Sequence, residues 1–193
     1  MPELVIAAET DISWTTPAII ANYIFNDHTR WNTKLFATIG NRNSVGFTQS
    51  ITINDTINST TKDYNNRVLN ADKYRNIGLE SRIITDYIIG KKQHTLSAGI
   101  RIYTGNTTRL ADGKGTTGSE YDMTVTGSYQ RDVTFTSNNI AAFAENIFRA
   151  GKKLLIIPGI RFEWLEGSAK GRNGFTSTGA EIKLQDVKRS RSF

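Results

Sequence analysis

Basic side chains in two long polar stretches are the residues best suited to bind a ligand. A guanidinium group is planar and can grip a carboxylate through two parallel hydrogen bonds. Loops that carry several such groups would attract an anionic chelate, although ordinary solvated charge gives the same pattern. The candidate ligand-binding residues are Arg42, Arg109, Lys114 and Arg131, in or beside the stretches 41–75 and 105–136.

The sequence shows no pattern for catalysis, for a cofactor or for a metal centre. His28 and His94 both lie in predicted short turns without a surrounding carboxylate or cysteine cluster, so we expect exposed turn histidines. The glycine-rich stretch 112–118 is not a phosphate-binding loop, because Gly115 follows Lys114 where serine or threonine is needed. We therefore expect a protein that is not an enzyme and that holds no cofactor.

Composition narrows the class of protein. The chain has 193 residues, a formal net charge of +6 and no cysteine. Positive charge suits nucleic acid or an anionic surface, but basic and aromatic residues do not interleave on one platform, so we expect no nucleic-acid partner. No apolar run reaches the ~18 residues of a transmembrane helix, although membrane-spanning strands leave no such signal. The basic segment 168–193 is predicted to be a loop or a disordered tail.

β-Strands must position the candidate residues, because helical periodicity is hard to find. Three strand pairs are predicted, over residues 17–40, 76–104 and 138–167, and each pair is joined by a short connection rich in turn residues. The long polar loops 41–75 and 105–136 separate the pairs. Strict alternation of short turns with long loops is typical of an outer-membrane barrel and unusual for a compact soluble domain.

The predicted strands have one apolar and one polar side. Ile156, Ile160, Phe162 and Trp164 share one side of the last pair, and residues 141–150, despite their helix propensity, are predicted as a strand like their neighbours. Charge recurs on the polar side, where either a water-filled lumen or the solvated face of an ordinary sheet would tolerate it. Strand length and loop asymmetry favour the barrel, with its apolar row facing lipid. The predicted lumen-facing residues are Lys34, Glu80, Arg82, Arg101, Arg161 and Glu163.

Several segments resemble the barrel of TonB-dependent outer-membrane receptors, and in particular the ferric dicitrate receptor type. They are YRNIGLESR at 74–82, HTLSAGIRIYTG at 94–105, GKGTTGS at 113–119 with Tyr121 and Asp122, NIAAFAENIFR at 139–149 and PGIRFE at 158–163. Residues 41–47 are also similar to a loop of that group. The resemblance extends from Pro17 to Gly167.

The resemblance implies a fold, a location and partners. We expect an all-β antiparallel meander of about six to seven long strands, a partial segment of a transmembrane barrel of about 22 strands, with no plug domain. The implied location is the outer membrane, in contact with its lipid. The implied function is uptake of a ferric chelate, a siderophore or iron citrate, driven by an inner-membrane TonB complex through the absent plug. Because an open sheet cannot close in lipid, we expect the chain to be inactive alone.

A protein of another class stays open as the alternative. A soluble β-sandwich that binds carbohydrate or another ligand would also have strands with one polar side. The two hypotheses differ in what covers the apolar side. In a sandwich it packs against a second sheet, whereas in a barrel wall it faces lipid.

Overall fold

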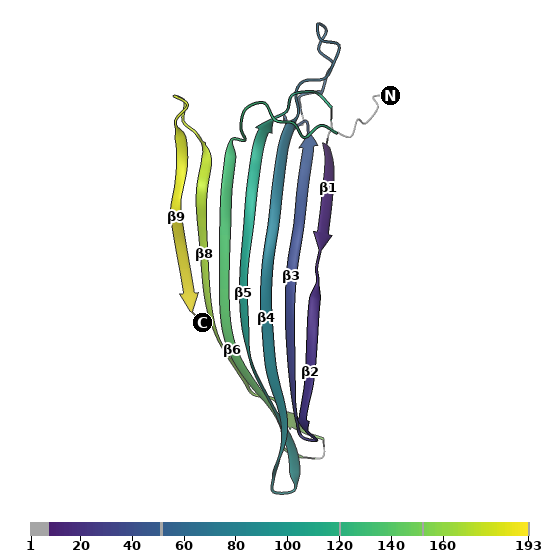
Figure 1. Cartoon of the computed structure of the whole chain (residues 1–193), viewed down its shortest axis with the longest axis vertical. Helices are drawn as coiled ribbons and strands as arrows, with labels where there is room; N and C mark the ends of the chain where they lie inside the picture. The colour runs from purple at the N-terminus through teal and green to yellow at the C-terminus, as the bar shows by residue number, and fades with distance from the viewer. Residues whose placement is uncertain (1–7, 51, 120, 152, 193) are drawn as a thin grey trace.

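A computed structural model describes residues 8–50, 52–119, 121–151 and 153–192, and this part of the chain is all β. The strands lie side by side in one elongated sheet (Figure 1). No helix among these residues is long and apolar enough to cross a membrane. The strands are β1 (Ala8–Thr15), β2 (Ala18–Asn26), β3 (Thr29–Gly46), β4 (Val68–Ile89), β5 (Lys92–Lys114), β6 (Arg131–Arg149), β7 (Leu155–Ile156), β8 (Gly159–Phe175) and β9 (Glu181–Ser192).

The sheet is an antiparallel meander in which successive strand positions pair side by side. The order is β1-β3-β4-β5-β6-β8-β9, while β2 also pairs with β3 and β7 also pairs with β6. Because β1 and β2 share one partner, as β7 and β8 do, the nine described strands occupy seven positions across the sheet. The predicted meander of six to seven long strands is confirmed, and residues 141–150 are strand over most of their length.

Two prolines divide the interrupted strand positions. Pro17 stands between β1 and β2, and Pro158 stands between β7 and β8. Proline has no N–H to donate to a ladder, but its carbonyl still accepts: Ala37 N donates to Pro17 O and Asn146 N donates to Pro158 O, each at 3.0 Å. Each break is therefore local, and the chain continues along the same neighbour.

The short β2–β3 and β4–β5 turns lie at one end of the sheet, and the long connections lie at the other, where the short β8–β9 turn also lies (Figure 1). In the β2–β3 turn the Asn26 side-chain oxygen accepts from the N–H groups of His28 and Thr29, both at 2.9 Å. Gly90 closes the β4–β5 turn with φ +63°, which suits a residue without Cβ. The predicted alternation of short and long connections is present.

The predicted lengths of the long loops are wrong. The connections are 47–67 and 115–130, because β3 and β5 continue to Gly46 and Lys114 and the next strands begin at Val68 and Arg131. The ladder continues through pairs such as Arg42–Asp72. Both faces of the sheet are polar in this region, so the alternation that reveals a strand is lost although its hydrogen bonds remain.

The prediction of a loop or disordered tail over 168–193 is also wrong for residues 168–192, and residue 193 lies outside the described part of the chain. β8 extends to Phe175, β9 follows from Glu181, and the two pair across a turn in which Thr176 N donates to Ala180 O at 2.8 Å. The segment is rich in charged residues and lacks apolar alternation. Pairing with a long neighbouring strand orders it, since the backbone ladder needs no apolar side chain.

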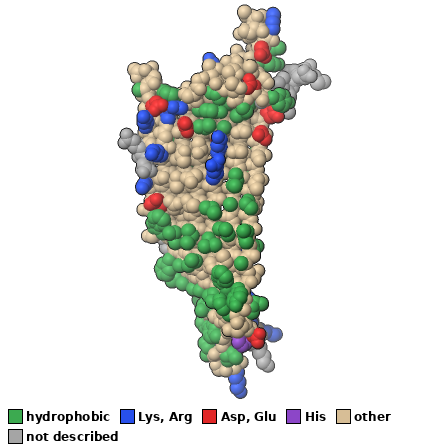
Figure 2. Space-filling view, viewed as in Figure 1, with side chains coloured by type: hydrophobic (Ala, Val, Ile, Leu, Met, Phe, Trp, Pro, Cys, Tyr) green, Lys and Arg blue, Asp and Glu red, His purple; other side chains and the backbone are tan. Residues whose placement is uncertain are grey.

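The register aligns one apolar row across the whole sheet. The row is made of Ile19, Leu35, Leu79, Ile102, Ile140 and Trp164. Figure 2 shows such rows of hydrophobic side chains across the middle and lower part of the molecule. Phe162 is 63% exposed and Ile160 57%. Leaving such a side chain in water forfeits about 1.5–3 kcal/mol of burial, so this face requires an apolar cover.

The described strands form a single sheet, and no second sheet covers its apolar face. Most of the small buried core lies at the end that carries the long connections, whereas Ala141 lies in the middle of the sheet, in one register row with Glu80 and Arg101. Its apolar members are Val45, Leu69, Ala71, Ala111, Val133 and Ala141. A β-sandwich requires two packed layers, so the soluble sandwich alternative is wrong for this fold.

On the other face, aromatic rings lie over glycines of the neighbouring strand. A Cβ at Gly99 would be 2.7 Å from Phe143 Cζ, and one at Gly40 would be 2.6 Å from Trp14 Cε3. Phe36 covers Gly78 more closely still. Glycine is required at these positions because the rings occupy the space of a side chain.

Candidate functional site

The register brings the six predicted lumen-facing residues onto one face, opposite the apolar row. Lys34 pairs with Glu80, Glu80 with Arg101, and the row continues through Ala141 to Glu163. The adjacent row leads from Arg82 through Gly99 and Phe143 to Arg161. We call this the inner face. Its charged residues come from β3, β4, β5 and β8, so only the assembled sheet brings them together.

Carboxylates and aromatic rings hold these inner-face charges. Arg161 donates to both oxygens of Glu163, from Nε at 3.0 Å and from Nη2 at 3.2 Å, and Asn139 Nδ2 donates to the same carboxylate at 2.7 Å. The Lys34 ammonium and the Arg101 guanidinium lie 5.7 and 6.0 Å from the centroid of the Phe36 ring. This middle part of the inner face is polar and largely compensated in charge.

Nearer the long connections, two arginines share one buried carboxylate. Arg42 Nη2 forms a short ion pair with Asp72 Oδ2, and Arg109 Nε lies 3.8 Å from Oδ1. The Asp72 side chain is 5% exposed, whereas those of Arg42 and Arg109 are 47% and 52% exposed. Tyr74 OH also donates to Oδ2, at 3.3 Å. Two guanidinium groups on one carboxylate leave an excess of positive charge at the surface.

The structure unites only two of the four predicted ligand-binding cations. Arg42 and Arg109 meet at Asp72, whereas Arg131 pairs with Asp112 at 3.2 Å and Lys114 ends β5. All four lie in strands and not in the connections, which corrects their expected placement. The strands extend further than the polar sequence suggests, and they carry these residues with them.

Asp72 and Tyr74 were not predicted from the sequence, although a signal for them exists. Both are an even number of residues from Glu80 and Arg82 along β4. A prediction that began this strand nearer to Val68 would therefore have placed them on the inner face. Polar residues on both sides of this segment concealed its strand character.

Arg67 ties the two long connections together. Its side chain is 3% exposed, its Nη1 lies 2.7 Å from Asp55 Oδ2, and its guanidinium lies 5.1 Å from the Tyr64 ring centroid. Its backbone N donates to Thr117 O at 3.1 Å, and Gly115 N donates to Arg67 O at 2.8 Å. Connections 47–67 and 115–130 are therefore joined over the end of the sheet.

Asp122 organises the second connection. Its carboxylate accepts from Thr124 N at 2.8 Å and from Thr116 Oγ1 at 3.1 Å. Hydrogen bonds from Thr124, followed by that from Thr116, hold the pKa of Asp122 below its usual value.

The expectation of two exposed turn histidines is wrong for His94. Its side chain is buried, and its ring centroid lies 5.5 Å from the ring centroids of Tyr87 and Phe148. Its Nδ1 accepts a hydrogen bond from Arg149 N at 3.3 Å. His28 is exposed in the β2–β3 turn, as predicted. The described residues contain no group of three or more His, Cys, Asp or Glu side chains that could hold a metal.

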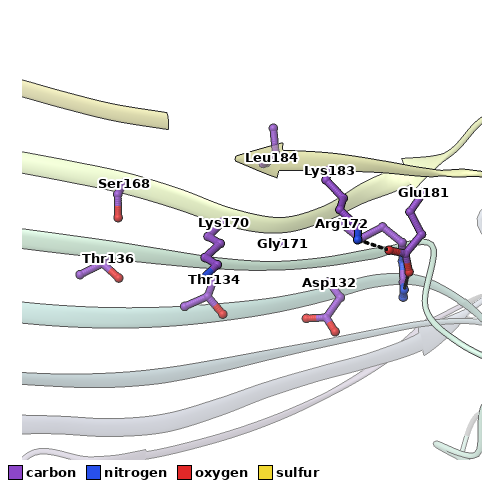
Figure 3. Close-up of a pocket in the computed structure, with 10 residues that line it drawn as sticks. All are labelled: Asp132, Thr134, Thr136, Ser168, Lys170, Gly171, Arg172, Glu181, Lys183 and Leu184. Carbon is purple, nitrogen blue, oxygen red and sulfur yellow. Dashed lines mark hydrogen bonds and ion pairs between the residues drawn. The ribbon is translucent and has the colours of Figure 1, made fainter. Parts of the chain in front are cut away.

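A hollow of about 750 Å³ lies between β6, β8 and β9 (Figure 3). Arg172 closes one end through Glu181 at 2.8 Å and through a hydrogen bond to Tyr129 O at 2.8 Å. Thr134 and Lys170 are an even number of residues from Ile140 and Trp164 on the same strands, so their side chains are on the same side as the apolar row. The hollow is therefore not on the inner face. The lining residues are Asp132, Thr134, Thr136, Ser168, Lys170, Gly171, Arg172, Glu181, Lys183 and Leu184.

A solved structure of the ferric-catecholate import receptor Fiu from E. coli K12, in its closed form, is similar to this fold. The TM-score is 0.64 at 13% sequence identity, and the match covers 97% of this chain and 30% of that chain. At this identity the likeness is one of fold. The chain spans less than a third of the length of that receptor. No curated protein matches the chain.

The family comparison covers nearly all of the sequence. The model of the TonB dependent receptor-like β-barrel matches residues 8–192, from the first residue of β1 to the last residue of β9. The ferric dicitrate type stays a prediction from the sequence. With one apolar face, one charged face and short and long connections at opposite ends, the chain belongs to the TonB dependent receptor-like β-barrel family.

Proposed function

We propose that these seven strand positions form part of the wall of an outer-membrane receptor that takes up a negatively charged ferric chelate. The observation that carries the proposal is the sorting of side chains by the register within a sheet of this family: an apolar row on one face and a charged surface on the other. In a barrel wall the first face meets lipid and the second lines a water-filled lumen.

The apolar face has the height of a membrane. On β4 its residues run from Ile77 to Tyr87, which are ten residue steps apart in the sequence. That corresponds to about 33 Å along a strand. A tilt of about 40° reduces it to about 25 Å of height, the thickness of the apolar band of outer-membrane barrels.

Arg42 and Arg109 are the proposed anion-binding groups. They are half exposed, lie on the inner face near the long connections, and share a single carboxylate. Bidentate binding of guanidinium to carboxylate suits a citrate-type chelate, in line with the ferric dicitrate resemblance. Arg131 and Lys114, at the same end of the sheet, would add to the attraction of anions towards the lumen.

Uptake requires more strands than the sheet provides. β1 and β2 lie at one edge and β9 at the other, and these edges do not pair with one another. Unpaired backbone groups are not stable in hydrocarbon, so further strands must close the barrel. We propose that the chain transports nothing alone, and that energy reaches the closed barrel from an inner-membrane TonB complex through a plug domain.

Trp14 offers a direct test of chelate binding. Its ring lies 4.8 Å from that of Tyr74, whose hydroxyl donates to Asp72. We expect ferric dicitrate to quench tryptophan fluorescence of the detergent-refolded chain in a saturable way. The double variant Arg42→Gln/Arg109→Gln should weaken binding at least tenfold. The charge-matched variant Lys91→Gln/Lys153→Gln, in the turns at the far end, should bind as the parent does.

Equal binding by the two double variants would contradict the assigned site, and citrate without iron separates chelate binding from binding of any anion. Uptake of radioactive ferric citrate by receptor-deficient cells that express only this chain would contradict the proposed inactivity.

A further inference from the structure

We call the face opposite the inner face the outer face. It carries the apolar rows, and beyond them, at the end with the long connections, it is charged. The outward-facing residues that follow Ile77 towards this end are Arg75 and Lys73, and Lys73 shares a register row with Thr108, Thr134 and Lys170. A column of basic side chains stands above the hydrophobic rows on the face drawn in Figure 2. This charge belongs to the face that meets lipid, and the inner-face site does not use it.

Three of these cations are exposed and have no acidic partner among the described residues. Lys73, Arg75 and Lys170 lie farther than 4 Å from every described carboxylate, although Asp132 and Glu166 occupy the same face. Arg42, Arg109 and Arg172, by contrast, all have carboxylate partners. Unpaired cations repel one another, so a row of them favours a surface that meets anions.

Hydroxyl and amide groups fill the space between the cations. Thr108 Oγ1 and Thr134 Oγ1 lie 3.4 Å apart, and Thr136 Oγ1 donates to Asn106 Oδ1 at 2.9 Å. Figure 3 shows Lys170 reaching from β8 towards its register partner Thr134 on β6, in the hollow of about 750 Å³. Cations beside hydroxyl donors in an open hollow match the needs of a phosphate group.

The position along the strand identifies the source of the phosphate. Arg75 and Lys73 lie two and four residue steps beyond Ile77. At the tilt used above, these steps place their Cα atoms about 5 and 10 Å beyond the apolar band. Lipid headgroups occupy the layer about 5–8 Å thick at this level.

We propose that Lys73, Arg75 and Lys170, with the hydroxyl-lined hollow between β6, β8 and β9, bind the phosphate headgroups of anionic lipids of the surrounding membrane. The inference rests on the proposed membrane location, but it does not depend on a ferric chelate. Its effect is to fix the depth of the wall in the bilayer, because cations held at the headgroup layer resist movement in either direction.

The test measures association of the refolded chain with phosphatidylcholine vesicles that contain or lack phosphatidylglycerol. We expect the parent to favour the anionic vesicles, and Lys73→Gln/Arg75→Gln/Lys170→Gln to lose that preference by roughly fivefold per cation. The charge-matched variant Arg30→Gln/Lys34→Gln/Arg82→Gln changes only the inner face and should keep it. Equal losses in the two triple variants, or no preference in the parent, would overturn the proposal.

A second measurement reads out the face directly. The chain has no cysteine, so Thr136→Cys and Ser137→Cys each give a unique labelling site, on the outer and the inner face respectively. A fluorophore at position 136 should be quenched by a headgroup-nitroxide lipid, and one at position 137 should not. Free inorganic phosphate should compete no better than chloride of equal ionic strength; specific displacement by phosphate would instead indicate a soluble phosphate ligand. Ferric chelate is absent throughout, so this proposal and the proposed uptake fail independently.

Discussion

The part of the sheet with the apolar rows and the part near the long connections use the same strands in different ways. On β4, Leu79 and Ile83 alternate with Glu80 and Arg82, whereas further back Lys73 and Arg75 alternate with Asp72 and Tyr74. The hydrogen-bonded ladder continues through both regions. Backbone pairing therefore makes the strand, while the surroundings of each face decide which side chains it carries.

The two regions also differ in what stabilises their faces. In the part with the apolar rows, aromatic rings fill the space above glycines of neighbouring strands. Towards the long connections, ion pairs and a small buried core that includes Leu69 perform this role. Substitutions of the same kind should therefore have different effects in the two regions.

The largest expected effect is that of a charge on the side that is proposed to face lipid. Ile100→Lys, opposite Ser81 near the middle of the band from Ile77 to Tyr87, should destabilise the chain in phospholipid vesicles by about 2–4 kcal/mol, the cost of a lysine near the bilayer midplane. Thr108→Lys, on the same face of β5 but near the long connections, should cost about 0–1 kcal/mol. Urea unfolding from vesicles, followed by tryptophan fluorescence, measures both. Equal costs would mean that the apolar row does not face lipid.

A smaller effect is expected where a ring covers a glycine. A Cβ at Gly99 would lie 2.5 Å from Ser81 O and 2.7 Å from Phe143 Cζ, so Gly99→Val should cost about 1–3 kcal/mol through overpacking. At Gly167 the single close neighbour is Thr136 O at 3.9 Å, so Gly167→Val should be tolerated. The unfolding midpoints of the two variants in one detergent give the comparison. Tolerance at Gly99 would show that Phe143 can move aside.

Within the region near the long connections, a buried carboxylate should matter more than an exposed one. Asp72→Asn weakens the contacts with Arg42 and Arg109 and should cost about 1–2 kcal/mol. Asp112→Asn affects only the Arg131 pair, in which both side chains are about half exposed, and should cost about 0–1 kcal/mol. Urea midpoints of the two variants decide between them; a larger loss for Asp112→Asn would contradict the ranking by burial.

The smallest effect is a local change with pH in the second long connection. The hydrogen bonds from Thr124 and Thr116 lower the pKa of Asp122 in the folded chain. They therefore stabilise the connection above the pKa of the unfolded chain, and this contribution disappears as the pH falls through the lowered folded pKa. Exchange of the Thr124 amide proton should quicken over that acidic range. Asp122→Asn should abolish this pH dependence; a variant that keeps it would exclude Asp122 as the cause.

The sequence predicted the fold where the two faces meet different surroundings. Alternation revealed the row that includes Leu79, Ile102 and Trp164, and Asn26 and Gly90 marked the short turns. Polar residues on both faces concealed all of β9 and those ends of β3 to β6 that lie near the long connections. Extended pairing there depends on the neighbouring strand, which a local pattern does not report.

The candidate site was only partly predictable, for the same reason. Arg42 and Arg109 were named as loop cations, but their meeting at Asp72 results from a register across three strands. Nothing in the spacing of these residues indicates that register. His94 was predicted to lie in an exposed turn. The turn ends before Lys92, so His94 belongs to β5 and its ring packs between Tyr87 and Phe148.

The meander order also determines how the sheet can assemble. Every described strand except β1 pairs with a neighbour in sequence, β1 pairs with β3 two elements on, and the tight turns after Asn26 and Ile89 bring strand ends together at little loop-closure cost. Hairpins of this kind form in about 1–10 μs. The pairs β2–β3 and β4–β5 are therefore the natural first units of folding, and the unpaired edge of each hairpin is available to pair with the next. A wall built in this way can grow by successive hairpins, with no need to bring the two ends of the chain together first.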